Sequence, residues 1–396
     1  MLNDAGRRRH AAIGPLLAVV ASAGLCWLLV QVRPERLRAL STPEFPIACR
    51  NGWIVSVGKN SNRLQGLPMR EGRSRTLTPH FGTPGTLRAT FYTDLGVVIR
   101  SEEQEPAPEP VGASRHPFEF NPGRLRARLW EVALDGRPAH ELLPQVRMTQ
   151  AVASGENCYW LSPGAARATP AAEGRPWNVA AWRNGELRVT PLRGDGSRLI
   201  ATRLSLFTRL EPLGRGVSWS VPRRGTLRGD RYLALPPDYE VHVVPDCTGA
   251  PELLAGRLYW FDQRLGLAAG APVQPELKLV SATLDGEDRR ELLDLAGNPK
   301  WDERGRLLGV HQEKLYALLY RRPTKAGMPD RPVLCEVRGE SIREVAALRS
   351  AIGFTWLESG YLYYTAEELQ ENWLDWTPKG LATKRTQVLY RTRLVA

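Results

Sequence analysis

The sequence predicts an all-β protein: a β-propeller of seven four-stranded blades, with six blades as the alternative, preceded by one N-terminal transmembrane helix. Three observations support this prediction. The chain has 36 Gly and 31 Pro in 396 residues, a strand pattern recurs along it, and an uncharged apolar segment lies near its N-terminus. So many Gly and Pro residues indicate turns rather than long helices. A four-stranded unit that recurs every 40–50 residues or so is typical of a propeller blade.

Composition and charge narrow the class of protein. The chain is 42% hydrophobic and 24% charged, which excludes a disordered or collagen-like chain. Its formal net charge is +12. The basic residues are scattered through every segment and form no long stripe of the kind that nucleic-acid binding usually needs. We therefore expect no nucleic-acid partner.

The N-terminal segment predicts a membrane anchor. Residues 11–32 carry no charged side chain and, at about 1.5 Å per helical residue, are long enough to cross a bilayer. Residues 1–10 contain Arg7, Arg8 and Arg9, and we expect this basic tail to be cytoplasmic. The chain would then be a single-pass protein of the cytoplasmic membrane, with its C-terminal domain extracytoplasmic. Cleavage at the small residues 21–23 and lipidation of Cys26 are the alternatives. The chain has no Asn-x-Ser/Thr acceptor, which favours a bacterial envelope protein.

Two features of the remaining chain share one spacing, of roughly 50 residues, and so mark the blades in order. One strand of each blade is marked by an apolar or aromatic residue: Trp53, Val98, Tyr159, Trp219, Tyr259, Tyr316 and Tyr363. A turn near the end of six blades is marked by Gly72, Gly136, Gly185, Pro237, Gly286 and Gly339. Seven strand positions predict seven blades, in a propeller domain that spans residues 43–396.

The last blade needs a fourth strand from elsewhere in the chain. Residues 388–394 have the pattern of a third strand, and the chain then ends. An open sheet edge promotes aggregation, so a propeller ring is expected to be closed. Residues 36–42 have the pattern of an outer strand and would complete the seventh blade. The segment 33–42 is therefore either this closing strand or a linker from the membrane.

Residues 256–293 carry the clearest repeat. Leu258, Tyr259, Trp260, Phe261 and Asp262 form one strand, and ATLDGEDRRELL supplies a second strand, the turn Asp285-Gly286 and a third strand. Asp-Gly between two strands is a strong hairpin signal, because glycine takes the positive φ that the turn requires.

This segment resembles a YWTD repeat of the low-density-lipoprotein-receptor class B propellers. Residues 129–143 match it in part, and residues 361–365 more faintly. Degenerate propellers of the bacterial envelope are similar too. The resemblance implies protein or peptide binding on a propeller face, a structural role for Asp262 and no catalytic residues. Domains of that family have six blades, so the resemblance supports a propeller rather than an orthologous receptor.

The candidate binding residues lie in insertions between the second and third strands of the blades. These insertions span residues 102–123, 163–176, 222–229, 263–276, 321–332 and 367–386. Alternate turns of an up-and-down blade lie at the same end, so the insertions should gather on one face, which in repeat proteins is often the binding face.

Two groups of residues in these insertions suit a ligand. Trp373, Asp375 and Trp376 suit a sugar or a peptide, because indole rings offer apolar area beside a polar group. The alternative is that these Trp residues pack their loop onto the blade. The basic pairs would attract an anion or simply be solvated: Arg223 with Arg224, and Arg321 with Arg322.

Catalytic and metal-binding motifs are missing from the sequence. The six His residues show no metal-binding spacing, and no Gly-x-Ser-x-Gly or phosphate-binding Gly loop occurs. We therefore predict no catalytic residues, no metal site and no cofactor. Four cysteines follow the predicted anchor and fall in different blades: Cys49, Cys158, Cys247 and Cys335. Buried free thiols are therefore favoured, although four cysteines also allow three disulfide pairings.

The function favoured by these features is a binding or scaffold module, which would not be an enzyme. It would be membrane-anchored and extracytoplasmic, and its loop face would bind a protein, a peptide or an envelope glycan. The alternative is a lyase or hydrolase that acts on a polysaccharide or peptide at the propeller axis. The propeller fold hosts both classes and does not decide between them. Carboxylates and a His at the axis would favour the enzyme, and exposed Trp and Arg on a flat face would favour binding.

Overall fold

The computed structural model describes residues 34–40, 44–50, 52–58, 64–70, 72–77, 86–93, 96–104, 125–132, 140–164, 184–206, 208–222, 229–264, 276–295, 297–323, 331–350, 352–377 and 380–394. These residues form seven four-stranded antiparallel sheets, which confirms the prediction of seven blades. The predicted transmembrane segment, residues 11–32, lies outside the described residues. Among the described residues, no helix is long and apolar enough to cross a membrane.

The blades follow one another along the chain. Blade 1 contains β2 (Glu44–Arg50), β3 (Trp53–Gly58), β4 (Leu64–Pro68) and β5 (Arg75–Thr76). Blade 2 contains β6 (Thr86–Thr93), β7 (Gly96–Gln104), β8 (Leu125–Val132) and β9 (His140–Arg147). Blade 3 contains β10 (Gln150–Ser154), β11 (Asn157–Pro163), β12 (Gly185–Pro191) and β13 (Arg198–Leu204). Blade 4 contains β14 (Leu210–Leu213), β15 (Gly216–Pro222), β16 (Gly229–Ala234) and β17 (Val241–Val244).

The last three blades complete the ring. Blade 5 contains β18 (Glu252–Leu254), β19 (Arg257–Arg264), β20 (Glu276–Thr283) and β21 (Arg290–Asp294). Blade 6 contains β22 (Trp301–His311), β23 (Lys314–Arg321), β24 (Arg331–Arg338) and β25 (Ser341–Ala347). Blade 7 contains β26 (Ile352–Glu358), β27 (Tyr361–Thr377), β28 (Gly380–Arg393) and, from the N-terminal side of the chain, β1 (Glu35–Leu40).

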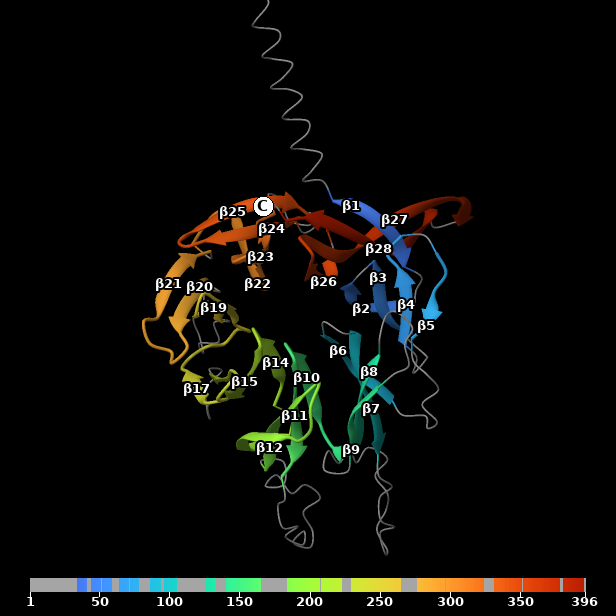
Figure 1. Cartoon of the computed structure of the whole chain (residues 1–396). Helices are drawn as coiled ribbons and strands as arrows, with labels where there is room; N and C mark the ends of the chain where they lie inside the picture. The colour runs from blue at the N-terminus through green and yellow to red at the C-terminus, as the bar shows by residue number, and fades with distance from the viewer. Residues whose placement is uncertain are drawn as a thin grey trace, which may run out of the picture.

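The first strand of each blade is innermost. First strands of neighbouring blades contact one another, as β6, β10 and β14 do on one side of the ring and β18, β22, β26 and β2 on the other. Figure 1 shows the sheets arranged around a central axis, with blade 7 between blades 6 and 1. The innermost strands therefore border the axis.

The residues that marked the blades in the sequence belong to the second strands. All seven predicted strand positions, from Trp53 to Tyr363, lie on the second strand of a blade. Four of the six predicted turns lie between a third and a fourth strand: Gly72, Pro237, Gly286 and Gly339. Gly136 lies outside the described residues, and the prediction for Gly185 was wrong. Gly185 begins the third strand β12, and the turn of that blade follows Pro191, where Gly196 has a φ of 91°. Both are glycines near a strand end, so the sequence spacing alone did not distinguish a strand start from a turn.

The middle strands are mostly apolar because neighbouring blades cover both of their faces. In β23, Leu315 and Leu319 pack against blade 5, whereas Tyr316 and Leu318 pack against blade 7. Burying a large apolar side chain contributes roughly 1.5–3 kcal/mol. Tyr159 adds a polar link between blades, since its hydroxyl donates to the carbonyl oxygen of Arg215 at 2.8 Å. The core of the propeller is thus a set of interfaces between blades.

The ring is closed by β1, which pairs antiparallel with the C-terminal strand β28. Of the two roles considered for residues 33–42, the structure shows the closing strand for Glu35–Leu40. Leu40 is 3% exposed and packs with residues of blades 1 and 7, among them Ile54 and Leu389. The two ends of the propeller therefore share one sheet and one apolar cluster.

The turn at Asp285-Gly286 differs in detail from the predicted two-residue hairpin. Gly286 has the expected positive φ, 82°. Its N–H donates to the Thr283 carbonyl at 3.0 Å, and the Thr283 N–H donates to the Glu287 carbonyl at 3.1 Å, so the loop has three residues. This arrangement matches the three-residue hairpin loop in which glycine forms a bulge.

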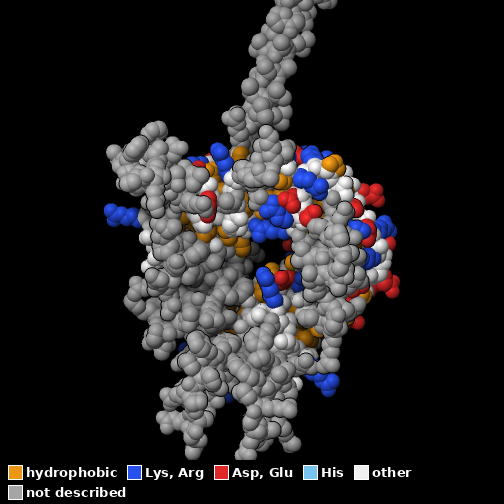
Figure 2. All heavy atoms as spheres, turned by 180° about the vertical axis from the view of Figure 1, so that it is seen from behind, with side chains coloured by type: hydrophobic (Ala, Val, Ile, Leu, Met, Phe, Trp, Pro, Cys, Tyr) orange, Lys and Arg blue, Asp and Glu red, His pale blue; other side chains and the backbone are white. Residues whose placement is uncertain are grey.

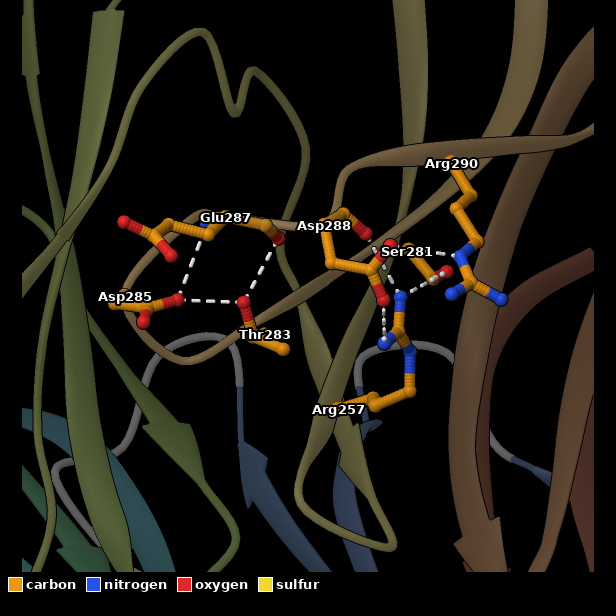
Figure 3. A network of polar contacts seen from close by, with 7 residues as sticks. All are labelled: Arg257, Ser281, Thr283, Asp285, Glu287, Asp288 and Arg290. Atoms are coloured by element: carbon orange, nitrogen blue, oxygen red, sulfur yellow. Dashed lines mark hydrogen bonds and ion pairs between the residues drawn. The ribbon is translucent and has the colours of Figure 1, made fainter.

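Polar side chains hold this loop in place (Figure 3). Thr283 Oγ1 donates to Asp285 Oδ1 at 2.5 Å, and the Glu287 N–H donates to the same oxygen at 3.0 Å. Beside the loop, the Asp288 carboxylate accepts from Arg257 Nη1 at 2.7 Å and from Arg290 Nε at 2.9 Å. The third-to-fourth-strand connection of blade 5 is therefore a fixed structural unit.

One predicted insertion is not a loop. Residues 367–386 belong mostly to the long hairpin of β27 and β28, whose register continues from Glu371 paired with Thr383 to Trp376 paired with Leu381. Continued pairing satisfies backbone groups that a loop would leave to water. The other five predicted insertions lie mostly outside the described residues.

The cysteine prediction is confirmed. The four cysteines of the propeller are free and buried: Cys49, Cys158, Cys247 and Cys335. Burial raises the pKa of the Cys158, Cys247 and Cys335 thiols to about 12, so these groups are poor nucleophiles near neutral pH.

Candidate functional site

The residues predicted to bind ligand do not form one described site. Trp373, Asp375 and Trp376 lie on β27, but their side chains are outside the described part of the structure. Arg223 and Arg224 are also outside it. The Arg321 guanidinium lies 2.5 Å from the Glu344 carboxylate. Arg322 Nε donates to the Trp301 carbonyl oxygen at 3.1 Å. Arg321 and Arg322 therefore make contacts that hold blade 6 together.

The innermost strands carry charged residues that the sequence analysis missed. Glu211 lies on β14, Glu252 on β18, and Arg304 and Arg306 on β22. Figure 2 shows an opening at the centre of the ring, bordered by Lys or Arg and by Asp or Glu side chains. For Glu211 and Glu252 the only sequence signal was a charged residue inside a strand of 4 or 3 residues, which is too short to be recognised without its blade.

The first group lies between blades 4 and 5. Arg231 of β16 has a side chain that is only 5% exposed, and its Nη1 atom lies 2.7 Å from Glu211 Oε2. Its Nη2 atom donates to the Gly249 carbonyl oxygen at 2.8 Å. Arg209 Nε lies 3.4 Å from the other oxygen of Glu211. Two guanidinium groups thus neutralise the Glu211 carboxylate and fix it beside the axis.

Glu252 differs from Glu211 because it has no hydrogen-bond or ion-pair partner among the described residues. It is half-buried, and burial raises the pKa of its carboxyl group from 4.5 to about 7. The negative charge of Glu211 contributes a smaller rise in the same pKa. A carboxyl group that titrates near neutrality either donates or accepts a proton, and such groups often mark functional sites.

The second group lies on β22 of blade 6. Arg304 is paired with Asp302 at 2.6 Å, and its guanidinium lies 4.7 Å from the centre of the Tyr320 ring. Arg306 is exposed, and no described residue forms a hydrogen bond or ion pair with it. Two innermost strands therefore carry side chains that the described residues leave unpaired: the half-buried carboxyl group of Glu252 on β18 and the exposed guanidinium of Arg306 on β22.

The contacts of Asp262 agree with the structural role that was predicted for it. Its side chain is 5% exposed, accepts from Thr248 Oγ1 at 2.9 Å and lies 3.2 Å from Arg289 Nη2. The Arg289 guanidinium in turn lies 5.3 Å from the centre of the buried Trp260 ring. These contacts tie the connection between blades 4 and 5 to blade 5. Among the described residues, no group of three or more His, Cys, Asp or Glu side chains could hold a metal ion.

No family model and no curated protein matches the chain. The YWTD resemblance of residues 256–293 is therefore not confirmed and stays a prediction.

Solved structures are similar at the level of the fold. The β-propeller domain of the Trilobed protease from Pyrococcus furiosus is 12% identical, with 70% of this chain and 78% of that chain covered and a TM-score of 0.45. Polysaccharide lyase Uly1 is 10% identical, with 89% and 91% covered and a TM-score of 0.47. Pyrococcus horikoshii acylaminoacyl peptidase is 12% identical with a TM-score of 0.48; the match covers 81% of this chain but only 48% of that one. TolB proteins are similar as well. The seven four-stranded sheets of the described residues make the chain a seven-bladed β-propeller.

Proposed function

We propose that the protein is a membrane-tethered propeller that binds a polypeptide segment at its axis. The tether is the uncharged span of residues 11–32, preceded by Arg7, Arg8 and Arg9. One observation carries the proposal. Glu252 and Arg306 lie on adjacent blades, and neither has a hydrogen-bond or ion-pair partner among the described residues. A ligand that enters the axial opening meets both of them.

A polypeptide fits this pair better than a glycan does. Glu211 is already neutralised by two guanidinium groups, so Glu252 is the carboxyl group left for a ligand cation. Arg306 is the guanidinium left for a ligand carboxylate. Peptides carry both signs of charge, whereas a neutral or acidic glycan leaves Glu252 without a partner and its desolvation uncompensated. A peptide ammonium beside Glu252 also favours the ionised form of its carboxyl group.

The proposal is tested by capture of partners from detergent-solubilised membranes with the full chain as bait. Glu252→Gln and Arg306→Gln remove the two charges and should each reduce the captured partner several-fold. Arg290→Gln is the matched control, because Arg290 is exposed on the outer strand β21. Retention of the partner by both axial variants would overturn the axial site.

Trp376→Ala tests the hairpin of β27 and β28 as the alternative binding surface. If this hairpin is the site, the variant should lose the partner while the axial variants keep it. Thermal unfolding of each variant shows whether lost binding reflects a lost fold.

A hydrolase or lyase at the axis is the second candidate, and the titration of Glu252 favours it. A carboxyl group with a pKa of about 7 beside an ionised carboxylate suits a general acid. Activity on polysaccharide or peptide substrates should then fall as the pH rises through about 7, because the acid form is lost. Glu252→Gln should abolish that activity. Residual activity with an unchanged pH profile would exclude Glu252 as the acid.

A further inference from the structure

The outer rim of blades 7 and 1 lies close to the proposed membrane span. The closing strand β1 begins at Glu35, so only residues 33 and 34 separate it from residues 11–32. Two extended residues reach at most about 7 Å. If residues 11–32 cross a bilayer, β1 must start at the level of the lipid headgroups. The rim around β1 is therefore the part of the propeller nearest the membrane.

Arginine side chains gather on this rim. We name the rim patch by its six residues: Arg36, Arg38, Arg70, Arg73, Arg391 and Arg393. The first two lie on β1, the last two on the neighbouring β28, and the middle pair follows β4 of blade 1.

Contacts hold the three segments together. Arg38 Nη1 lies 3.1 Å from the Pro68 carbonyl oxygen and 3.3 Å from that of Gly72, which connects β1 to the segment carrying Arg73. Arg70 Nη2 lies 3.8 Å from Glu35 Oε1, and Arg391 Nε lies 2.7 Å from Glu35 Oε2. The patch is thus assembled by ring closure from segments at both ends of the domain.

The rim patch keeps an excess of positive charge. Among the described residues, the carboxylates that the ion-pair distances place beside it are those of Glu35 and Glu368, the latter 3.3 Å from Arg36 Nε. Two carboxylates do not neutralise six guanidinium groups. Arg73 and Arg393 are exposed and form no hydrogen bond or ion pair with any described residue, and the Arg70 side chain is 76% exposed. These three groups are available to external anions.

We propose that the rim patch binds the anionic headgroups of the bilayer that holds residues 11–32. This inference rests on the membrane tether of the proposed function. Arginine pairs well with phosphate, and basic residues next to a membrane span are attracted to anionic lipid. The propeller then stands on the rim of blades 7 and 1, with its axis along the membrane plane. Both ends of the axial opening stay free for a ligand.

The test uses the full chain in lipid nanodiscs of phosphatidylcholine alone or mixed with phosphatidylglycerol. The readout is amide hydrogen exchange of residues 64–77, which carry Arg70 and Arg73. We expect exchange to be several-fold slower in the nanodiscs that contain phosphatidylglycerol, and high salt should remove the difference because it screens the charges. Equal exchange in the two lipids would overturn the proposal.

Two triple variants distinguish lipid binding by the rim patch from a nonspecific attraction of the basic protein to anionic lipid. Arg70→Gln, Arg73→Gln and Arg393→Gln together should abolish the lipid dependence. The control is Arg193→Gln, Arg203→Gln and Arg290→Gln, which removes as many exposed charges from other blades and should preserve it. A control that behaves like the patch variant would overturn the rim patch. Failure of the wild-type chain to co-elute with nanodiscs would instead overturn the tether, and the rim patch with it.

Discussion

Glu35 and Arg391 form an ion pair at 2.7 Å although 356 positions separate them in the sequence. The pair joins the first described strand of the chain to the last one. It stands at one end of a register that runs from Glu35 with Arg391 to Leu40 with Gln387. The propeller is therefore a closed ring whose last blade cannot form until both ends of the domain are present.

Removal of the closing strand should weaken the fold. Deletion of residues 1–42 removes β1 and exposes the edge of β28, whereas deletion of residues 1–34 leaves β1 intact. The melting temperature should be lower for the longer deletion. Leu40→Ala should by itself reduce the free energy of unfolding by about 2–5 kcal/mol, because Leu40 is buried between blades 7 and 1. Equal melting temperatures for the two deletions would show that β1 is dispensable.

Gly286→Val should destabilise the propeller for two reasons. Gly286 has a φ of 82°, which a β-branched residue tolerates poorly, at a cost of roughly 1–3 kcal/mol. An added Cβ atom would also lie 2.8 Å from Pro245 Cδ, at the end of the neighbouring blade 4. Gly339→Val is the matched control, since Gly339 has a φ of 56° and open space around it. Urea unfolding should show the larger loss for Gly286→Val, and equal losses would mean that the contact with Pro245 relaxes freely.

Glu252 should make the stability of the propeller depend on pH. Its folded-state pKa of about 7 lies above its usual value of 4.5, so the folded state holds the proton more tightly than the unfolded state. The stabilisation is complete below about 4.5 and is lost as the pH rises through about 7, by on the order of 3 kcal/mol. Unfolding free energies measured from pH 4 to 8 should lose this slope in Glu252→Gln. They should keep it in Glu240→Gln, because Glu240 is exposed.

Arg231→Ala should be among the most destabilising single substitutions. It leaves the Glu211 carboxylate without its 2.7 Å partner and the Gly249 carbonyl without its donor. Removal of one member of a buried ion pair costs about 3–5 kcal/mol. Arg290→Ala, on the exposed surface of β21, should change the unfolding free energy little. Similar losses for the two variants would mean that water replaces the Arg231 contacts.

The membrane topology can be measured directly. A reporter enzyme that works only outside the cytoplasm, fused to the C-terminus, should be active, because we expect the basic residues 7–9 to keep the N-terminus inside. A reporter that works only in the cytoplasm should be inactive at the same position. The opposite pattern would contradict both the signal anchor and the extracytoplasmic propeller.

The sequence by itself favoured seven blades over six and determined much of each blade's frame. Second strands are buried on both faces, so they read as apolar runs around residues such as Tyr159 and Tyr316, and their spacing counts the blades. Gly286 was recognisable as a turn residue because its backbone conformation is a local property. The four thiols were assigned as free because strands of separate blades rarely bring cysteines close enough to bond.

Only the tertiary structure decided which charged side chains lie close together. Glu211 and Glu252 lie on different blades, and Arg231 reaches Glu211 from the third strand of its own blade, so no short sequence motif contains them. The same holds for the rim patch, which exists because β1 pairs with β28 beside blade 1. Strands and turns can be recognised from neighbouring residues, because side-chain alternation and turn chemistry are local properties. The contacts between blades depend on the position of each sheet in the ring. That position is fixed only when the whole domain has packed and the ring has closed.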